Sequence, residues 1–257
     1  MSSLWLFPIA VGAGAFGSML GLGGGIILVP ALTLLMGVDI KIAVATSLVG
    51  VAATSCAGVQ TYLQSGLVDW RIAVRLLIPT VSGAIAGGLL LPFLSPRWVA
   101  GLFILLIFYV LGQMVWAMRH PRPASPQGGE CRARWNPQQR TIAVGLSLFG
   151  GITSAILGVG GGLIQVPLLH AILKAPLRCA IGTSTFLIGA TASTSALLYL
   201  VQGKLQPDIV VPATLGVLVG ARLGAKFAQR VPATVLRLLF LGVMLYTVAR
   251  LYLRWFV

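Results

Sequence analysis

The stretch that decides the fold is GLGGGIILVPAL, residues Gly21–Leu32, which returns 137 residues later as GVGGGLIQVPLL, residues Gly158–Leu169. The match continues without a gap. Between Ala15–Leu48 and its partner, 12 of 34 positions are identical, where composition alone would give roughly three. The same shift places Tyr62 on Tyr199. The chain is therefore predicted to consist of two homologous halves.

The composition places both halves in a membrane. Charged residues make up 9% of the 257, against about 25% in soluble domains, and mean hydropathy is +0.98. So few charges cannot cover a soluble globule, and so much apolar sequence excludes disorder. We therefore expect an all-α polytopic membrane protein with apolar spans at Leu4–Met36, Ile42–Leu63, Ile72–Leu94, Trp98–Met118, Thr141–Leu173, Cys179–Val201, Ile209–Gln229 and Ala233–Leu253.

The charge pattern indicates orientation rather than nucleic-acid binding. The formal net charge is +14, but the basic residues lie singly or in small groups between apolar stretches, as the positive-inside rule describes. The extended polar segment, residues 119–140, holds five arginines together with prolines and glycines. We interpret it as a basic cytoplasmic linker between a first transmembrane repeat, residues 1–118, and a second, residues 141–257.

The two longest spans leave the topology open. Each has 33 residues and is broken by glycines and a proline, which is too long for a simple crossing of about 30 Å. If each is one crossing, a half has four crossings and the repeats are parallel. If each folds back at its glycines, a half has three crossings plus a re-entrant hairpin, and the repeats are inverted. Arg222 and Arg237 fall within spans and are left out of the count. The inverted arrangement then puts eleven basic residues inside and five outside, whereas the parallel arrangement puts ten inside and six outside. The positive-inside rule therefore favours inversion.

The glycine runs are the first candidate site. Glycine permits a left-handed backbone, and each run precedes an apolar stretch that can begin a helix, whose free N–H groups attract anions. Two such turns meeting at the repeat interface would hold an anion without a buried charge. The alternative is close helix packing, because GxxxG also occurs here.

Polar residues near these runs are further candidates. Thr46-Ser47 and Thr183-Ser184 occupy equivalent places and could donate to an oxyanion, or bond a carbonyl within their own helices. Lys41 and Arg178, also equivalent, could attract anions or anchor the spans at the headgroups. Gln165, whose counterpart is Leu28, could contact substrate or a neighbouring helix.

Other chemistries find little support. The chain has four acidic residues, all at span ends or in the linker, so proton coupling through a buried carboxylate is not expected. No nucleophile–base pair and no histidine or cysteine spacing suited to a metal occurs. We expect no enzyme activity, no cofactor and no metal.

The paired GxGGG-x4-P turns, the A-x2-T-S sequences after them and GA-x2-G at Gly83–Gly87 resemble the sulfite exporter TauE/SafE family over essentially the whole chain. The resemblance implies a multi-pass protein of the bacterial inner (cytoplasmic) membrane that transports sulfur-containing anions such as sulfite or organosulfonates. It does not identify the anion.

The expected function is therefore a secondary transporter, most simply an exporter, because an inside-negative potential favours outward movement of an anion by about 2.3 kcal/mol per charge per 100 mV. An importer, a channel-like anion pathway and a non-transporting scaffold are the alternatives, and association of identical chains is left open. Expected substrate-binding residues are Gly23, Gly24, Gly25, Thr46, Ser47, Gly160, Gly161, Gly162, Gln165, Thr183 and Ser184. Expected hairpin-shaping residues are Gly21, Pro30, Gly158 and Pro167, and expected anion-attracting residues are Lys41 and Arg178.

Overall fold

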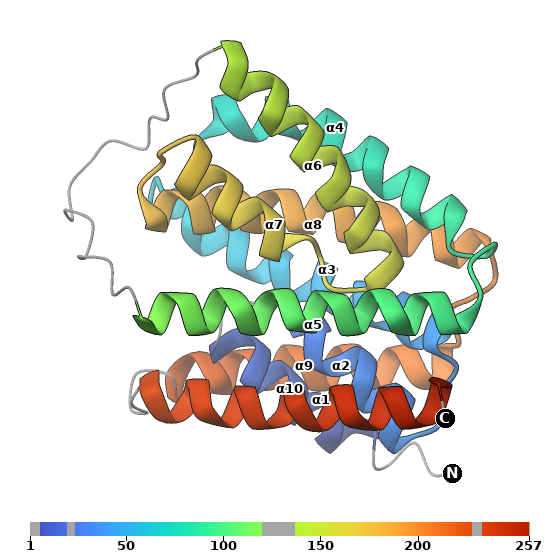
Figure 1. Ribbon diagram of the computed structural model, residues 1–257. Helices are drawn as coiled ribbons and strands as arrows, with labels where there is room; N and C mark the ends of the chain where they lie inside the picture. The colour runs from blue at the N-terminus through green and yellow to red at the C-terminus, as the bar shows by residue number, and fades with distance from the viewer. Residues whose placement is uncertain (1–5, 20–23, 120–136, 228–232, 257) are drawn as a thin grey trace.

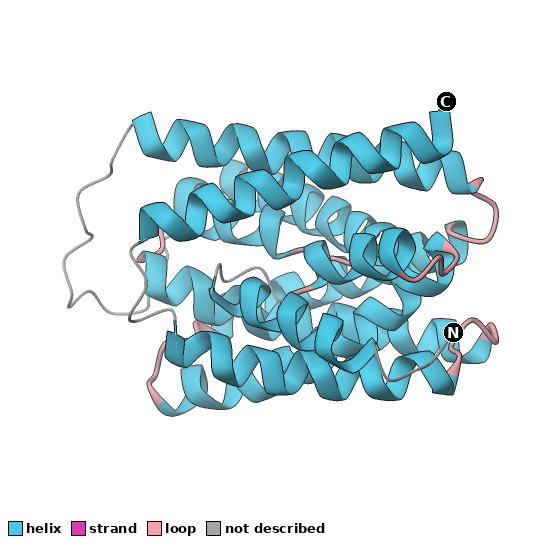
Figure 2. Cartoon of the chain, turned by 90° about the horizontal axis from the view of Figure 1, so that it is seen from below, coloured by secondary structure: helices cyan, strands magenta, loops and turns pink. Residues whose placement is uncertain are grey.

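The computed structural model describes residues 6–19, 24–119, 137–227 and 233–256, and every regular element in these ranges is a helix (Figure 2). Their order along the chain is α1 Leu6–Met19, α2 Gly25–Pro30, η1 Ala31–Leu35, α3 Ile40–Gln64, α4 Trp70–Leu90, α5 Pro96–Arg119, α6 Pro137–Leu157, α7 Gly162–Pro167, η2 Leu168–Ile172, α8 Leu177–Val201, α9 Pro207–Phe227 and α10 Ala233–Phe256. The two η elements are single turns of π-helix that continue α2 and α7.

The helices agree with the predicted apolar spans. Six of them are long and apolar enough to cross a membrane by length and composition: residues 40–64, 70–90, 96–113, 139–157, 178–201 and 207–224. Shorter apolar helices cover residues 6–16, 25–35 and 241–253. The prediction of an all-helical, multi-pass chain is confirmed.

The second 33-residue span folds back on itself at its glycines. Gly158, Gly160 and Gly161 all have positive φ, between 72° and 85°, a backbone that costs other residues about 1–2 kcal/mol. After this turn α7 packs against α6, because Gly150 of α6 faces Ile164. Figure 1 shows α7 running back from the middle of the molecule toward the end where α6 begins.

The first long span has a similar break. Gly24 caps α2 with φ 77° and lies against Gly14 of α1. Residues 20–23, which include the predicted positions Gly21 and Gly23, lie outside the described residues. Pro30 and Pro167 stand where α-helix gives way to the π turn, since proline supplies no N–H to continue the α-helical bonding.

The helices that the 137-residue shift relates run in opposite directions through the centre. A Cβ at Gly58 of α3 would lie 3.4 Å from Thr185 Cγ2 of α8, and one at Gly189 of α8 would lie 3.4 Å from Ser55 Cβ. Residue 58 of α3 thus lies beside residue 185 of α8, and residue 55 beside residue 189. Because the numbers fall along one helix as they rise along the other, the two helices are antiparallel. In Figure 1 α10 ends at the right, whereas α5 ends and α6 begins at the left.

Two further helix pairs pack through glycines. Gly83 of α4 lies against the Leu148 carbonyl of α6, and Gly220 of α9 lies against the Val11 carbonyl of α1, each so closely that a Cβ would clash. The 137-residue shift exchanges these two contacts, because it relates Gly83 to Gly220 and Val11 to Leu148.

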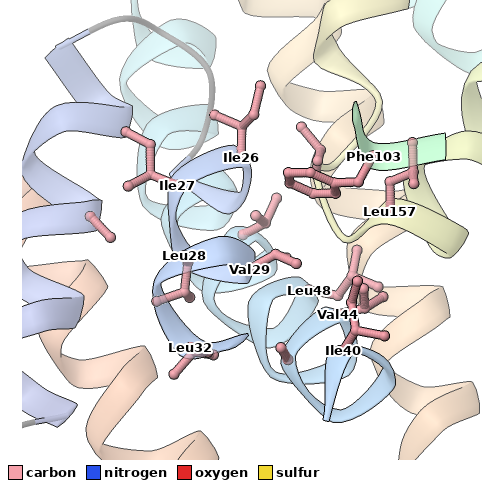
Figure 3. Close-up of a cluster of buried hydrophobic side chains, with 14 of the residues drawn as sticks. Ile26, Ile27, Leu28, Val29, Leu32, Ile40, Val44, Leu48, Phe103 and Leu157 are labelled. Atoms are coloured by element: carbon pink, nitrogen blue, oxygen red, sulfur yellow. The ribbon is translucent and has the colours of Figure 1, made fainter. Parts of the chain in front are cut away.

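The short helix α2 lies deep in the molecule. All six of its residues are buried, and Figure 3 shows Ile26 and Val29 on the side of Phe103 and Leu157, with Ile27 and Leu28 on the other side of the helix. In a bilayer these side chains stabilise the fold through van der Waals packing, because lipid is as apolar as the protein core. The broken helix is therefore part of the core and is not a surface loop.

Candidate functional site

The two glycine segments meet at the centre of the molecule. A Cβ at Gly25 would overlap the carbonyl oxygen of Gly158, and the Ser47 hydroxyl donates to that same oxygen at 2.7 Å. The first N–H groups of α2 and α7 have no carbonyl partner within their own helices. The structure thus brings together Gly24, Gly25, Ser47 and the turn at residues 158–161.

Two apolar side chains fill the space beside these turns. A Cβ at Gly25 would lie 3.0 Å from Val51, and one at Gly162 would lie 2.7 Å from Ile188. A Cβ at Gly160 would meet both side chains, at 2.7 and 2.9 Å. Val51 and Ile188 are themselves related by the 137-residue shift. We call this pair the central barrier.

The predicted hydroxyl pairs do not converge. Thr46 is fully buried and its hydroxyl has no partner among the described residues. On α8, the Thr183 hydroxyl accepts from the N–H of Asp69 at 3.0 Å, and the Ser184 hydroxyl donates to the carbonyl of Ile181 at 2.9 Å. Because α3 and α8 are antiparallel, the α8 pair lies beyond the level of Gly58, roughly 16 Å of helix rise from Ser47.

Gln165 is the most unusual polar residue of the second hairpin. Its side chain is fully buried on α7, next to Gly150, and neither amide atom has a hydrogen-bond partner within the described part of the chain. Leaving a buried polar group unpaired costs about 1–3 kcal/mol. Its counterpart Leu28 is buried in the apolar core without that cost.

Lys41 and Arg178 lie at opposite ends of the molecule. The Lys41 ammonium donates to the Pro92 carbonyl at 3.0 Å, in the loop between α4 and α5. It also lies near Lys204, whose pKa is lowered from its usual value by burial and by the charge of Lys41, against a smaller opposing effect of Asp39. Arg178 is exposed at the start of α8. Each end therefore has one of the two cations, and no single site receives both.

A cavity of about 540 Å³ opens between α3, α8 and α9. Its walls are residues 54–62, 181–188 and 218–222, and its polar lining consists of Thr54, Ser55, Gln60, Thr61, Tyr62, Thr185 and Arg222. Ile188 of the central barrier forms part of the wall. We call this space the α3–α8 cavity; within the described residues no carboxylate lines it.

Arg222 is the functional candidate that the sequence analysis missed. It falls within a predicted span. An ionisable residue in such a span ordinarily faces a water-filled cavity or the interior and marks a functional pathway, and this signal was available in the sequence.

The equivalent region at the other end of α3 and α8 is closed. Thr54, Tyr62, Ile181 and Thr185 all line the cavity and are partly accessible. Their counterparts Thr191, Tyr199, Val44 and Leu48 are each 0% exposed. The Tyr199 hydroxyl, moreover, donates to the Ala155 carbonyl at 2.8 Å.

The open end is also the more positive one. Among the residues whose side chains the structure describes, it holds six basic and one acidic, whereas the closed end holds four basic and two acidic. The first set is Arg71, Arg75, Arg140, Lys174, Arg178, Arg222 and Asp69; the second is Lys41, Arg97, Lys204, Arg250, Asp39 and Asp208.

Comparisons with known proteins agree with the membrane architecture. A family model described as sulfite exporter TauE/SafE matches residues 6–251. The chain is 25% identical over 250 residues to the probable membrane transporter protein YunE of Bacillus subtilis, with 90% of each chain covered. It is 29% identical to a probable membrane transporter protein of Xylella fastidiosa, covering 90% of this chain and 89% of the other. A third, from Haemophilus influenzae, is 27% identical with 92% and 94% covered. No solved structure matches at a significant level.

Proposed function

Because the chain belongs to the sulfite exporter TauE/SafE family, we propose that it exports small sulfur-containing oxyanions, of the sulfite or organosulfonate type, across the bacterial cytoplasmic membrane. The family consists of membrane transporters and not of enzymes. The substrate and the direction are the proposal.

The observation that carries the proposal is the α3–α8 cavity, lined by one cation and no described carboxylate. Such a lining favours an anion over a cation. The cavity opens at the more positive end of the molecule, which the positive-inside rule assigns to the cytoplasm. A cytoplasmic anion can therefore enter this conformation, and the membrane potential favours its outward movement.

The two halves, residues 1–118 and 141–257, are proposed to be inverted repeats joined by a cytoplasmic linker at 119–140. The antiparallel packing of α3 and α8 supports this arrangement, as do the exchangeable contacts of Gly83 and Gly220. Inverted repeats allow alternating access, in which one half takes up the conformation of the other. One end is open and the equivalent end is closed, as one state of such a cycle requires.

The glycine turns and their neighbours are proposed to line the route beyond the central barrier. Gly24, Gly25 and Gly160–Gly162 leave backbone N–H groups uncovered at the centre. Thr46 and Gln165 have buried polar atoms without partners, and these could bond a passing oxyanion. Ser47, Thr183 and Ser184 would have to exchange their backbone partners for substrate, whereas Lys41 and Arg178 would attract anions at opposite ends.

The test is sulfite efflux from proteoliposomes under an imposed potential, with sulfoacetate and chloride in parallel. We expect saturable efflux of a sulfur oxyanion. The double variant Gly24→Val and Gly161→Val should abolish it, because valine is strained at positive φ. Gly145→Val is the matched control, since a side chain there meets open space.

A second variant guards against misfolding. Gly24→Asn introduces a side chain, but asparagine still tolerates the left-handed backbone. A Cβ at this position has no contact closer than 3.6 Å. The variant should fold and retain measurable flux. Retained flux in the double valine variant would refute the role of the glycine turns, and chloride flux without saturation would favour the channel-like alternative.

Orientation has its own test. Cysteines placed at the C-terminus and in the linker should react with impermeant reagents from opposite sides of the membrane. Labelling of both from the cytoplasm would contradict the inverted arrangement.

A further inference from the structure

We infer that the α3–α8 cavity contains a recognition site for a small oxyanion, centred on Arg222 and separate from the glycine turns. The inference rests on the proposed function and adds a first binding step at the cytoplasmic mouth.

The position of Arg222 supports the inference. It lies on α9 within a cavity of about 540 Å³, large enough for a sulfur oxyanion with part of its hydration shell. Its guanidinium is exposed, and a guanidinium binds planar and tetrahedral oxyanions through paired N–H donors. Gln60, Thr61 and Tyr62 of α3 also line this cavity and add neutral donors.

The surrounding charges favour an anion. The chain has four acidic residues in all, and among the described ones only Asp69 lies at this end. Asp69 is engaged as the cap of α4, where its carboxylate accepts from the N–H groups of Arg71 and Ile72 at 3.1 and 3.3 Å. The positive potential of Arg222 is therefore not neutralised by a carboxylate in the cavity wall.

The second half has a cation at the position of Arg222, and the first half does not. The counterpart of Arg222 in the first half is Ile85, an exposed aliphatic residue of α4. Two otherwise equivalent halves thus differ at this position in the property that decides anion affinity. Such a difference is expected if anions are collected from one side of the membrane only.

The site is separated from the glycine turns by the central barrier. Ile188 lines the cavity on one side and contacts Gly160 and Gly162 on the other. An anion at Arg222 therefore binds before the barrier opens, and its binding is measurable without transport.

The experiment is equilibrium binding of radiolabelled sulfite to the purified full-length protein, with sulfate, sulfoacetate and chloride as competitors. We expect Arg222→Gln to weaken binding by about tenfold or more, because it removes a charge-assisted pair of hydrogen bonds. Arg222→Lys should stay within about tenfold of the parent, since it keeps the charge but loses the fork. Arg71→Gln removes an exposed charge from the same end, outside the cavity, and should leave binding unchanged.

Each outcome is decisive. Unchanged binding in Arg222→Gln would overturn the site and make Arg222 a headgroup anchor. An equal loss of binding in Arg71→Gln would attribute the effect to general surface potential and would overturn the site. Failure of the parent protein to bind any of the four anions would also overturn the site. Binding of sulfate but not sulfite that depends on Arg222 would keep the site and refute the proposed substrate. Loss of transport in the double valine variant with binding intact would confirm that the two sites are separate.

Discussion

The two ends of the α3–α8 pair are built from equivalent residues and yet differ in state. At one end Thr54 and Tyr62 border a cavity of about 540 Å³. At the other end their counterparts Thr191 and Tyr199 are completely buried. The local bonding is the same in both threonines, because each hydroxyl donates to the carbonyls three and four residues earlier. The threonines and tyrosines therefore differ through how the helices pack around them, whereas other lining residues, Gln60, Thr61 and Thr185, have the apolar counterparts Leu197, Leu198 and Leu48.

The unequal burial of the related threonines and tyrosines is therefore a property of the conformation that the chain adopts. If the halves exchange conformations, Tyr62 would become buried and its hydroxyl would approach the backbone carbonyl of residue 18, the counterpart of Ala155. Tyr199 would then border an opening on the other side. The buried tyrosine hydrogen bond contributes about 0.5–1.5 kcal/mol to the closed end, where Gln202 also donates to the Gly88 carbonyl.

The sharpest way to break the comparison is to enlarge both threonines. Thr54→Phe should place its ring in the cavity, leave thermal stability near that of the parent and lower sulfite flux by about tenfold or more. Thr191→Phe should overpack a closed core and destabilise the protein by about 1–3 kcal/mol. Thermal unfolding in detergent and efflux from proteoliposomes measure the two effects. Equal destabilisation by both changes would show that the two ends are packed alike.

The glycine hairpins give a second contrast, between Leu28 and Gln165. Gln165→Leu copies the first half into the second and removes two unpaired buried polar atoms. It should raise stability by about 1–3 kcal/mol and reduce flux, if the amide contacts substrate as proposed. Thermal unfolding and flux on the same preparation test this. Leu28→Gln is the reciprocal control and should lower stability, whereas a more stable Gln165→Leu variant with full flux would leave Gln165 without a role in transport.

The smallest expected effect distinguishes the tyrosines. Tyr199→Phe removes the hydroxyl that donates to Ala155 and should destabilise the closed end by about 0.5–1.5 kcal/mol. Tyr62→Phe should change stability by much less, because Tyr62 borders the cavity. The measurement is the difference in unfolding temperature between the two variants. Matching shifts would mean that the buried hydrogen bond contributes nothing specific.

The sequence predicted the helices well, since hydropathy over 20 or so residues leaves few alternatives in a bilayer. The break at the second glycine run was also foreseeable, because Gly158, Gly160 and Gly161 supply the backbone that the turn needs. The separation of Ser47 from Ser184 was not foreseen. It follows from the antiparallel packing of α3 and α8, which places equivalent residues on opposite sides of the centre.

The open end could not be predicted from the repeat. The matching glycines, threonines and tyrosines do not say which end is closed in a given state, although Gln60, Thr61 and Thr185 line the cavity where their counterparts are Leu197, Leu198 and Leu48. Arg222 was predictable in principle, since its counterpart Ile85 shows that the charge is not required for packing at that position. The unpaired amide of Gln165 needed the structure, because burial and the absence of a described partner are properties of the folded chain.

The position of the central barrier at the inner end of the cavity has an electrical consequence. If the α3–α8 cavity opens to the cytoplasm as proposed, water in it would carry the cytoplasmic potential as far as Ile188, and the transmembrane voltage would fall mainly across the barrier and the closed end beyond it. An anion at Arg222 would then sense little of the voltage, and the charge-carrying step would be the passage beyond Val51 and Ile188. Voltage should consequently change the maximal rate of transport, at about 2.3 kcal/mol per charge per 100 mV for a complete crossing, and leave the apparent affinity for the anion almost unchanged.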